Sequence, residues 1–203
     1  MSYDFDDSLG SKDIMLNITL SLSNYDITQW GNNVNGQYGM YMGIGLGSST
    51  MQNSDLILCT YVYRNRSDDK FNCYDQYTNN DRTRFNDTSN DIVNTFTISP
   101  SVSPLKLGKT NFTVKFQRKF RTSEAFPRDF QLASKIENIT YAYGAISGGS
   151  IQKCTANARG FKYFDLTRAP ATAGQDFTQS FALNQIKVFG LFLFAIITTI
   201  NNF

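Results

Sequence analysis

The sequence predicts an all-β protein, folded as an antiparallel β-sandwich and ending in a short hydrophobic helix. Short runs in which apolar and polar residues alternate recur along residues 13–167, with turn-forming residues between them. Aromatic residues make up 14% of the 203-residue chain, and there are only 4 prolines, a balance that favours strands over helices. No amphipathic helix precedes residue 180, so about nine or ten short strands must supply the core.

The first two expected strands, residues 14–22 and 38–46, each have one apolar face. In the first strand, Asn17 points away from that face. In the second strand, large apolar side chains alternate with a face made mostly of glycine: Tyr38, Met40, Met42, Ile44 and Leu46 against Gly39, Tyr41, Gly43 and Gly45. Glycine weakens a strand, so a glycine face is useful where another backbone or a flat ligand must approach closely.

Two cysteines are expected to face each other across a hairpin. Residues 56–63 predict a third strand and residues 71–77 a fourth, joined by the polar turn 64–70. If the turn centres near Arg66, residues whose numbers sum to about 132 are paired, and Cys59 and Cys73 meet this condition. The two form either a cross-strand disulfide or a pair of buried thiols, and Cys154 is left unpaired.

The remaining expected strands are residues 92–98, 112–120, 136–143, 151–154 and 160–166, separated by the loop 79–91, the connector 99–109 and a turn at 124–130. One residue breaks the pattern, because Arg118 lies in line with phenylalanines on the apolar face of its strand. A buried arginine needs a carboxylate partner, for which Asp55 and Asp129 are the candidates. Alternatively, Arg118 lies at the strand end and its guanidinium reaches water.

The composition argues against catalysis and against nucleic-acid binding. The chain has no histidine, which removes His-based acid–base chemistry, the usual catalytic triads and most zinc sites. Its net charge is only +2, without a basic block, and no zinc-hydrolase, nucleophile-elbow or phosphate-loop motif is present. Asp68, Asp69, Asp87 and Asp91 lack the spacing of a calcium loop. We therefore expect that the protein is not an enzyme.

Four stretches, in this order, resemble those of the DOMON family, the β-sandwich of dopamine β-monooxygenase-type and cellobiose dehydrogenase cytochrome-type proteins. They are YMGIGLG followed by SSTMQNSDLILC at residues 41–59, VKFQRKFRT at 114–122, RDFQL at 128–132 leading to YAYG at 141–144, and ARGFKYFDL at 158–166. The resemblance covers residues 13–167. It implies an immunoglobulin-like sandwich that binds a ligand, either haem b or a sugar, between its sheets.

The resemblance also suggests where a ligand would lie. In haem-binding members, iron is held by a methionine after the glycine-rich strand, matched here by Met51, and by a histidine before the closing strand. That second position falls within residues 153–157, where Cys154 or a deprotonated Lys153 is the available donor, with Met40 or Met42 as alternatives. Packing at the sandwich edge is the other interpretation of Met51. The ligand cleft expected from the resemblance is lined by Tyr41, Gly43, Gly45, Met51, Arg118 and Tyr143.

The C-terminal residues predict attachment to a membrane. Residues 188–200 are uncharged and almost wholly apolar. A GPI-attachment signal needs small residues, a polar spacer of ~8–12 residues and an apolar tail, and residues 171–174, 175–187 and the tail follow this order. A short transmembrane anchor and a buried terminal helix are the alternatives. No secretory signal is visible in residues 1–12, so the GPI interpretation requires a truncated or mis-assigned N-terminus.

Five N-glycosylation sequons occur, and their positions favour glycosylation more than their number does. They are Asn17, Asn65, Asn86, Asn111 and Asn138, of which Asn17 and Asn111 fall on outward strand faces and Asn65 and Asn86 in expected loops.

The sequence thus predicts a flexible arm (1–12), a DOMON-like sandwich (13–167), a linker (168–187) and a membrane segment or GPI signal (188–203). The predicted function is non-catalytic binding of a sugar or another small ligand at a membrane surface. The alternatives are a haem b electron-transfer domain that uses Met51 and a second ligand other than histidine, and a purely structural surface-coat protein.

Overall fold

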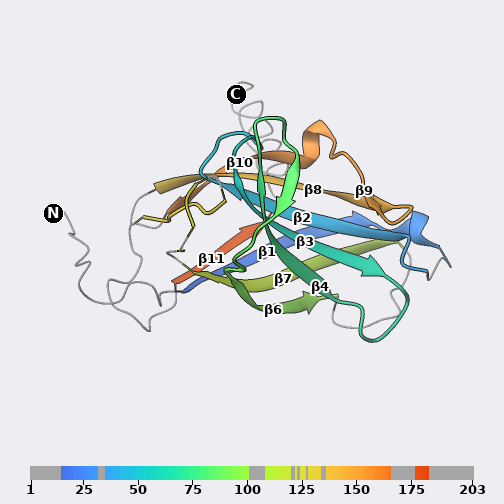
Figure 1. The fold of residues 1–203 in the computed structure, drawn as a ribbon. Coiled ribbons are helices and arrows are strands. Elements are labelled where there is room, and N and C mark those ends of the chain that lie inside the picture. Colours follow the sequence, from blue (N-terminus) through green and yellow to red (C-terminus); the bar gives the residue numbers. More distant parts are fainter. Residues whose placement is uncertain are drawn as a thin grey trace, which may run out of the picture.

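The computed structural model describes residues 15–31, 35–100, 108–119, 122, 124–126, 128–133, 136–165 and 177–182. Within these ranges the chain forms two facing β-sheets and two short 3₁₀ helices, η2 (Thr28–Trp30) and η3 (Ala156–Ala158). The two layers are visible in Figure 1. The predicted all-β sandwich is therefore confirmed.

The smaller sheet has four strands, in the order β11 (Phe177–Ala182), β1 (Met15–Asp26), β7 (Lys109–Lys119) and β6 (Ile92–Ser99). β1 pairs with β7 in the antiparallel sense, whereas β11 runs parallel to β1, with Leu16 opposite Phe177. The prediction that residues 168–187 form a linker is wrong for residues 177–182. These residues pair with β1 and cover the edge that β1 would otherwise expose.

The larger sheet has seven strands. Their order is β10 (Arg159–Asp165), β8 (Ile136–Ser147), β2 (Tyr38–Leu46), β3 (Asp55–Tyr63), β4 (Phe71–Thr78) and β5 (Arg84–Asn86), with β9 (Ser150–Ile151) paired to β8. All of these pairs are antiparallel. β5 lies inside the predicted loop 79–91, and β9 is shorter than the strand expected at 151–154. β2 is central, so its two faces decide what lies on either side of the sheet.

The hydrophobic core lies between the sheets and follows the alternation read from the sequence. The inward residues of β1, β2 and β7 are almost entirely shielded from solvent: Leu16, Ile18, Leu20 and Leu22, then Met40, Met42, Ile44 and Leu46, then Phe112, Val114 and Phe116. Trp30, in the connection between β1 and β2, stacks on Tyr61 and packs beside Phe112. The space between the sheets is therefore filled by side chains.

Cys59 and Cys73 form a disulfide, so of the two alternatives considered for this pair, the cross-strand disulfide is confirmed. β3 and β4 are antiparallel, and these two cysteines are directly opposite each other in the pairing. Cys154 is free and half-buried. The disulfide joins two neighbouring strands of the larger sheet, β3 and β4.

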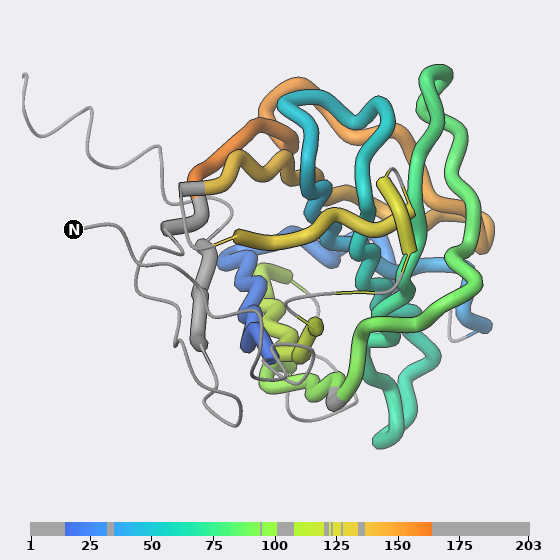
Figure 2. The backbone as a smooth tube through the Cα atoms, turned by 60° about the vertical axis from the view of Figure 1, so that its left-hand side comes forward, coloured from blue at the N-terminus to red at the C-terminus, as the bar shows by residue number. Residues whose placement is uncertain are grey.

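Arg118 is fully buried and forms an ion pair with Asp55, so of the alternatives considered, the buried pair is confirmed. The guanidinium of Arg118 on β7 also donates to the carbonyl oxygen of Phe130, at 3.0 Å, and to that of Lys119, at 2.9 Å. Asp55 begins β3, and its Oδ2 accepts a hydrogen bond from the backbone N–H of Phe130, at 2.8 Å. The ion pair thus joins β7 of the smaller sheet to β3 of the larger one. The backbone of Phe130, in the segment drawn yellow in Figure 2, is hydrogen-bonded to both of its members.

Four of the five sequon asparagines, Asn65, Asn86, Asn111 and Asn138, are exposed. Asn17 is not, which corrects its expected position on an open outward face. It lies on the central strand β1, is 5% exposed, and its Oδ1 accepts a hydrogen bond from Gln117 on β7. A glycan is bulky and needs a surface position, so Asn17 is unsuitable as an acceptor in the folded domain.

The predictions for the arm 1–12 and the tail 188–203 lie outside the described residues. Within the described ranges, no helix is sufficiently long and apolar to span a bilayer. Membrane attachment therefore stays a prediction from the sequence.

Replacing Arg118 by methionine should destabilise the domain strongly. The carboxylate of Asp55 would stay buried without its cation, and breaking a buried pair in this way typically costs about 3–5 kcal/mol. Denaturant unfolding of R118M against wild type measures this loss. The matched control is R128Q, which removes an exposed arginine paired with Glu124. Equal midpoints for R118M and R128Q would contradict the role assigned to the buried pair.

Candidate functional site

The candidate site lies on the outer face of the larger sheet, over the glycine face of β2. Gly43 pairs with Leu58 of β3 on one side and with Ala142 of β8 on the other. Leu58, Ala142 and Tyr41 form a second, small hydrophobic cluster on this face, against which Ile151 and Cys154 pack. Because glycine has no side chain, the backbone of β2 forms the floor between these neighbours.

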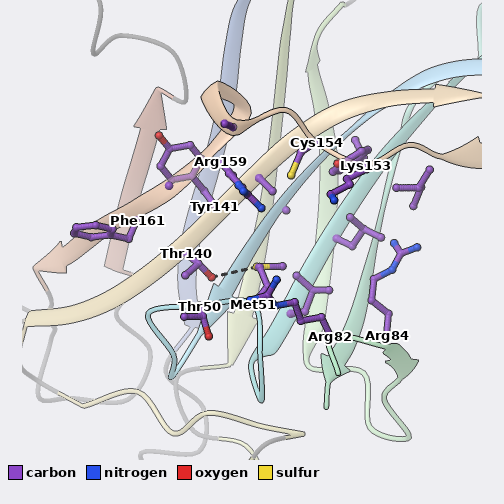
Figure 3. A pocket seen from close by; sticks show the side chains of 18 of the residues that line it. Thr50, Met51, Arg82, Arg84, Thr140, Tyr141, Lys153, Cys154, Arg159 and Phe161 are labelled. Atoms are coloured by element: carbon purple, nitrogen blue, oxygen red, sulfur yellow. Dashed lines mark hydrogen bonds between the residues drawn. The ribbon is translucent and has the colours of Figure 1, made fainter. Parts of the chain in front are cut away.

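A pocket of about 860 Å³ opens above this floor (Figure 3). Leu56, Leu58, Gly43 and Ala142 contribute the apolar base. The loop after β2 brings in Thr50 and Met51, and the segment after β9 brings in Gln152, Lys153 and Cys154. Its size is typical of small-molecule sites. A second hollow of about 610 Å³ continues along the same face and shares Leu58, Arg84 and Ile151 with the first.

The side chain of Met51 lies close to Gly45 on the glycine face of β2 and is hydrogen-bonded there by Thr140. Thr140 Oγ1 donates to Met51 Sδ, and also contacts the carbonyl oxygen of Gly45, both at 3.3 Å. A Cβ at Gly45 would lie 2.6 Å from Thr140 Oγ1 and 3.4 Å from Met51 Sδ. Gly45 is therefore needed for packing beneath Met51 and Thr140, and it does not line the pocket itself.

Tyr41 closes one side of the pocket. Its hydroxyl donates to the carbonyl oxygen of Gln152 at 3.0 Å, which ties β2 to the segment after β9. Its ring fills the space at Gly144, where a Cβ would lie 2.9 Å from the phenol. Burial, reinforced by the neighbouring Cys154, raises the pKa of Tyr41 above its usual value. The phenol is thus a neutral donor and not a base near neutral pH.

Positive charge surrounds the pocket. Arg82, Arg84, Lys153 and Arg159 all line it, and all four side chains are exposed. Figure 3 shows Arg82 and Arg84 together on one side, with Lys153 and Arg159 across the pocket from them. No carboxylate occurs among its lining residues, and none of the four cations has an ion-pair partner within the described ranges. A concave surface lined by charge of one sign attracts ligands of the opposite sign.

The structure brings together four of the residues selected from the sequence: Tyr41, Gly43, Met51 and Cys154. It separates two others from them. Arg118 belongs to the buried ion pair between the sheets, and Tyr143 lies on the core side of β8, packed against the central cluster. Neither lines the pocket: Arg118 is on β7, a strand of the other sheet, and the Tyr143 side chain packs against the core cluster. The expectation that they do is wrong.

The expected position of the cleft is also corrected. The resemblance implies a ligand between the sheets, but that space holds the hydrophobic core, and the pocket is on the outer face. Met40 and Met42 point into the core with no exposed surface, so neither can contact a ligand in this pocket. Cys154 and Lys153 remain as possible partners of Met51.

Sequence analysis missed the three arginines of the site. Arg82 and Arg84 lie in a stretch interpreted as a hydrophilic loop, where their i, i+2 spacing is the only available signal; Arg84 begins β5. Arg159 begins β10, inside the stretch that carries the DOMON resemblance. No local pattern shows that these two places converge, because β5 and β10 are at opposite edges of the sheet order.

The fold and the pocket define a class of domain: a two-sheet β-sandwich with an open, cation-lined pocket on the outer face of its larger sheet. No family model matches the chain. No curated protein matches it either. Among solved structures, the chain is similar to the cytochrome domain of Myriococcum thermophilum cellobiose dehydrogenase, with a TM-score of 0.41 and 12% identity. The match covers 76% of this chain and 66% of that domain, so the chain spans just under two thirds of its length. At this level the similarity carries no information on ligand or activity.

Alanine at Gly43 and at Gly45 should have different effects on stability. A Cβ at Gly43 meets its nearest neighbour, the carbonyl oxygen of Ile57, at 3.4 Å, whereas at Gly45 it would meet Thr140 Oγ1 at 2.6 Å. Overpacking of this kind costs about 1–3 kcal/mol, so G45A should unfold at lower denaturant concentration. G43A should keep wild-type stability. Equal losses for the two variants would contradict the close packing described at Gly45.

Proposed function

We propose that this domain binds, without chemical turnover, a small anionic ligand that has a flat apolar face. The observation that supports the proposal is the combination of four cationic side chains, no carboxylate, and an apolar glycine-containing floor in one pocket. Guanidinium groups present a rigid fork of donors that matches carboxylate, sulfate and phosphate. The floor offers apolar area that a ligand can bury.

The chemistry of the lining favours an acidic ligand over a neutral one. A neutral sugar is bound through paired donors and acceptors, and a site for it usually includes carboxylate or amide acceptors. Gln152 is the only side chain with a carboxylate or amide among the residues lining this pocket, so the pocket offers a single acceptor of this kind, Gln152 Oε1. If the ligand is a sugar, we therefore propose an acidic or sulfated one.

The proposal includes the location inferred from the sequence. Attachment through residues 188–203 would hold the domain at the outer surface of a membrane, with the exposed sequons Asn65, Asn86, Asn111 and Asn138 carrying glycans. The intact mass of the native protein tests this part, because it reports glycans, a lipid anchor and removal of the tail together.

An anionic and a neutral fluorescent probe should bind with different affinities. We expect 8-anilinonaphthalene-1-sulfonate to bind the folded domain in a saturable way, and N-phenyl-1-naphthylamine, its uncharged relative, to bind more weakly. The variant R84Q should weaken binding of the anionic probe by about threefold to tenfold, since one charged donor is lost from a concave site. The matched control is R66Q, an exposed arginine in the β3–β4 turn.

Equal affinity for the two probes, or equal effects of R84Q and R66Q, would contradict an anion site. No saturable binding of either probe to the folded domain would favour the purely structural role.

Haem b is a second candidate because two sulfur donors line the same pocket. Met51 and Cys154 both contribute to it, Cys154 is outside the disulfide, and the cationic rim would face the carboxylates of the group. Thr140 fixes the thioether of Met51 at the pocket wall, so the residues present fit such a group. Bound haem would supply one-electron chemistry. Met51 would be one ligand of the iron, and Cys154 or Lys153 would be the second.

Reconstitution with haemin separates the two candidates. Our proposal predicts that the absorption spectrum of the domain with haemin does not depend on Met51, so that M51L and wild type give the same Soret band or none. A Soret band that shifts in M51L and in C154S, but not in the core variant M42L, would instead establish the haem-carrying domain.

A further inference from the structure

A second group of polar residues lies away from the pocket, where the ends of β3, β4 and β7 meet the segment 128–130. Three carboxylates converge there: Asp55 at the start of β3, Asp75 on β4 and Asp129. One oxygen from each lies within 4.8 Å of the others. Asp55 and Asp129 have no exposed surface, and Asp75 is 7% exposed. The sequence indicates Asp55 and Asp129 as candidate partners of Arg118, but no local pattern predicts that Asp75 joins them, because the three residues come from separate parts of the chain.

Each of the three carboxylates is fixed by one oxygen and leaves the other unused. Oδ2 of Asp55 accepts from Arg118 and from the N–H of Phe130, Oδ2 of Asp75 accepts from the N–H of Asp91 at 2.7 Å, and Oδ2 of Asp129 accepts from the N–H of Glu124 at 3.3 Å. The Oδ1 atoms of all three are buried and have no hydrogen-bond donor among the described residues. Buried oxygens without a donor are rare and costly, so they indicate a missing partner.

The balance of charge around the cluster also indicates a missing cation. Asp91, also fully buried, adds a fourth carboxylate, whereas the described cations are Arg118, paired with Asp55, and Lys119, paired with Asp91 at 2.6 Å. Two negative charges are therefore left uncompensated among these residues if all four aspartates are ionised. Burial is the main cause that raises the pKa of Asp55, of Asp129 and of Asp75, the last to about 7. A divalent cation would remove this penalty.

We propose that Asp55, Asp75 and Asp129 form a calcium site that fastens β3, β4 and the segment 128–130 together. The donors are all carboxylate oxygens, which hard cations prefer, and no nitrogen or sulfur donor belongs to the cluster. Calcium suits the position better than magnesium because it accepts several carboxylates with irregular geometry, whereas magnesium keeps much of its water. The proposal does not depend on which ligand the outer-face pocket binds.

The test uses the full chain, freed of metal with a chelator and then titrated with CaCl₂ in a calorimeter and by thermal unfolding. We expect one saturable binding event and a higher melting temperature in calcium, with a smaller rise in the same concentration of MgCl₂. Absence of calcium binding by the folded protein would overturn the proposal. Equal stabilisation by magnesium would overturn the assignment to calcium.

The variant D75N gives a second readout that does not depend on loss of folding. The amide is the same size and its oxygen can still accept from the N–H of Asp91, while one negative charge is removed from the cluster. Without calcium, D75N should be as stable as wild type or more stable, and its calcium affinity should fall about tenfold or more because a charged ligand is lost. The matched control D68N changes an exposed aspartate in the β3–β4 turn and should bind as wild type does. Wild-type affinity in D75N would overturn the site.

Discussion

The main constraint on this structure is that the two faces of β2 have different neighbours. One face packs in the hydrophobic core, and the other forms the floor of the outer pocket. The position of β2 in the middle of the larger sheet gives both of its edges a paired neighbour, β3 and β8. One face carries Met40, Met42, Ile44 and Leu46 into the core, where burial of apolar side chains stabilises the sandwich. The other face consists mainly of glycine, which contributes little to packing and leaves room for Met51 and for the pocket above the sheet. A strand with large side chains on both faces would close the pocket.

The loop between β2 and β3 connects the pocket with the polar end of the sandwich. It carries Met51 to the pocket and then enters β3 through Ser54 and Asp55. Ser54 Oγ donates to the carbonyl oxygen of Thr50 at 2.8 Å, and the N–H of Ser54 donates to Thr78 Oγ1 on β4 at 3.0 Å. The position of Met51 therefore depends on the same short segment that places Asp55 beside Arg118. Stability of the ion pair and shape of the pocket are coupled through this segment.

The sequence was sufficient for those features that depend on local alternation. Period-two patterns predict the strands of the core and place Gly43 on the face of β2 opposite to the core. Together with one turn, they also predict the register that puts Cys59 opposite Cys73. Arg118 was recognised as anomalous, and Asp55 was one of its two candidate partners.

Features that depend on which strands become neighbours could not be derived in this way. Tyr143 is one example: the resemblance places it in a ligand cleft, whereas its parity on β8 places it against the core. The arginines at the rim come from edges of the sheet that only the complete strand order brings around one pocket. Asn17 has an outward parity, yet its position on a central strand beside Gln117 buries it. Burial on an outer face is decided by tertiary neighbours.

The most direct test of this account is a methyl NMR titration with 8-anilinonaphthalene-1-sulfonate in protein labelled at the methionine methyl groups. Met51 lines the outer pocket, whereas Met40 and Met42 lie on the opposite face of the sheet with no exposed surface. The account predicts a large saturable shift of the Met51 signal, with the signals of Met40 and Met42 almost unchanged. Shifts of Met40 and Met42 without a shift of Met51 would show that the ligand enters between the sheets, and would contradict it.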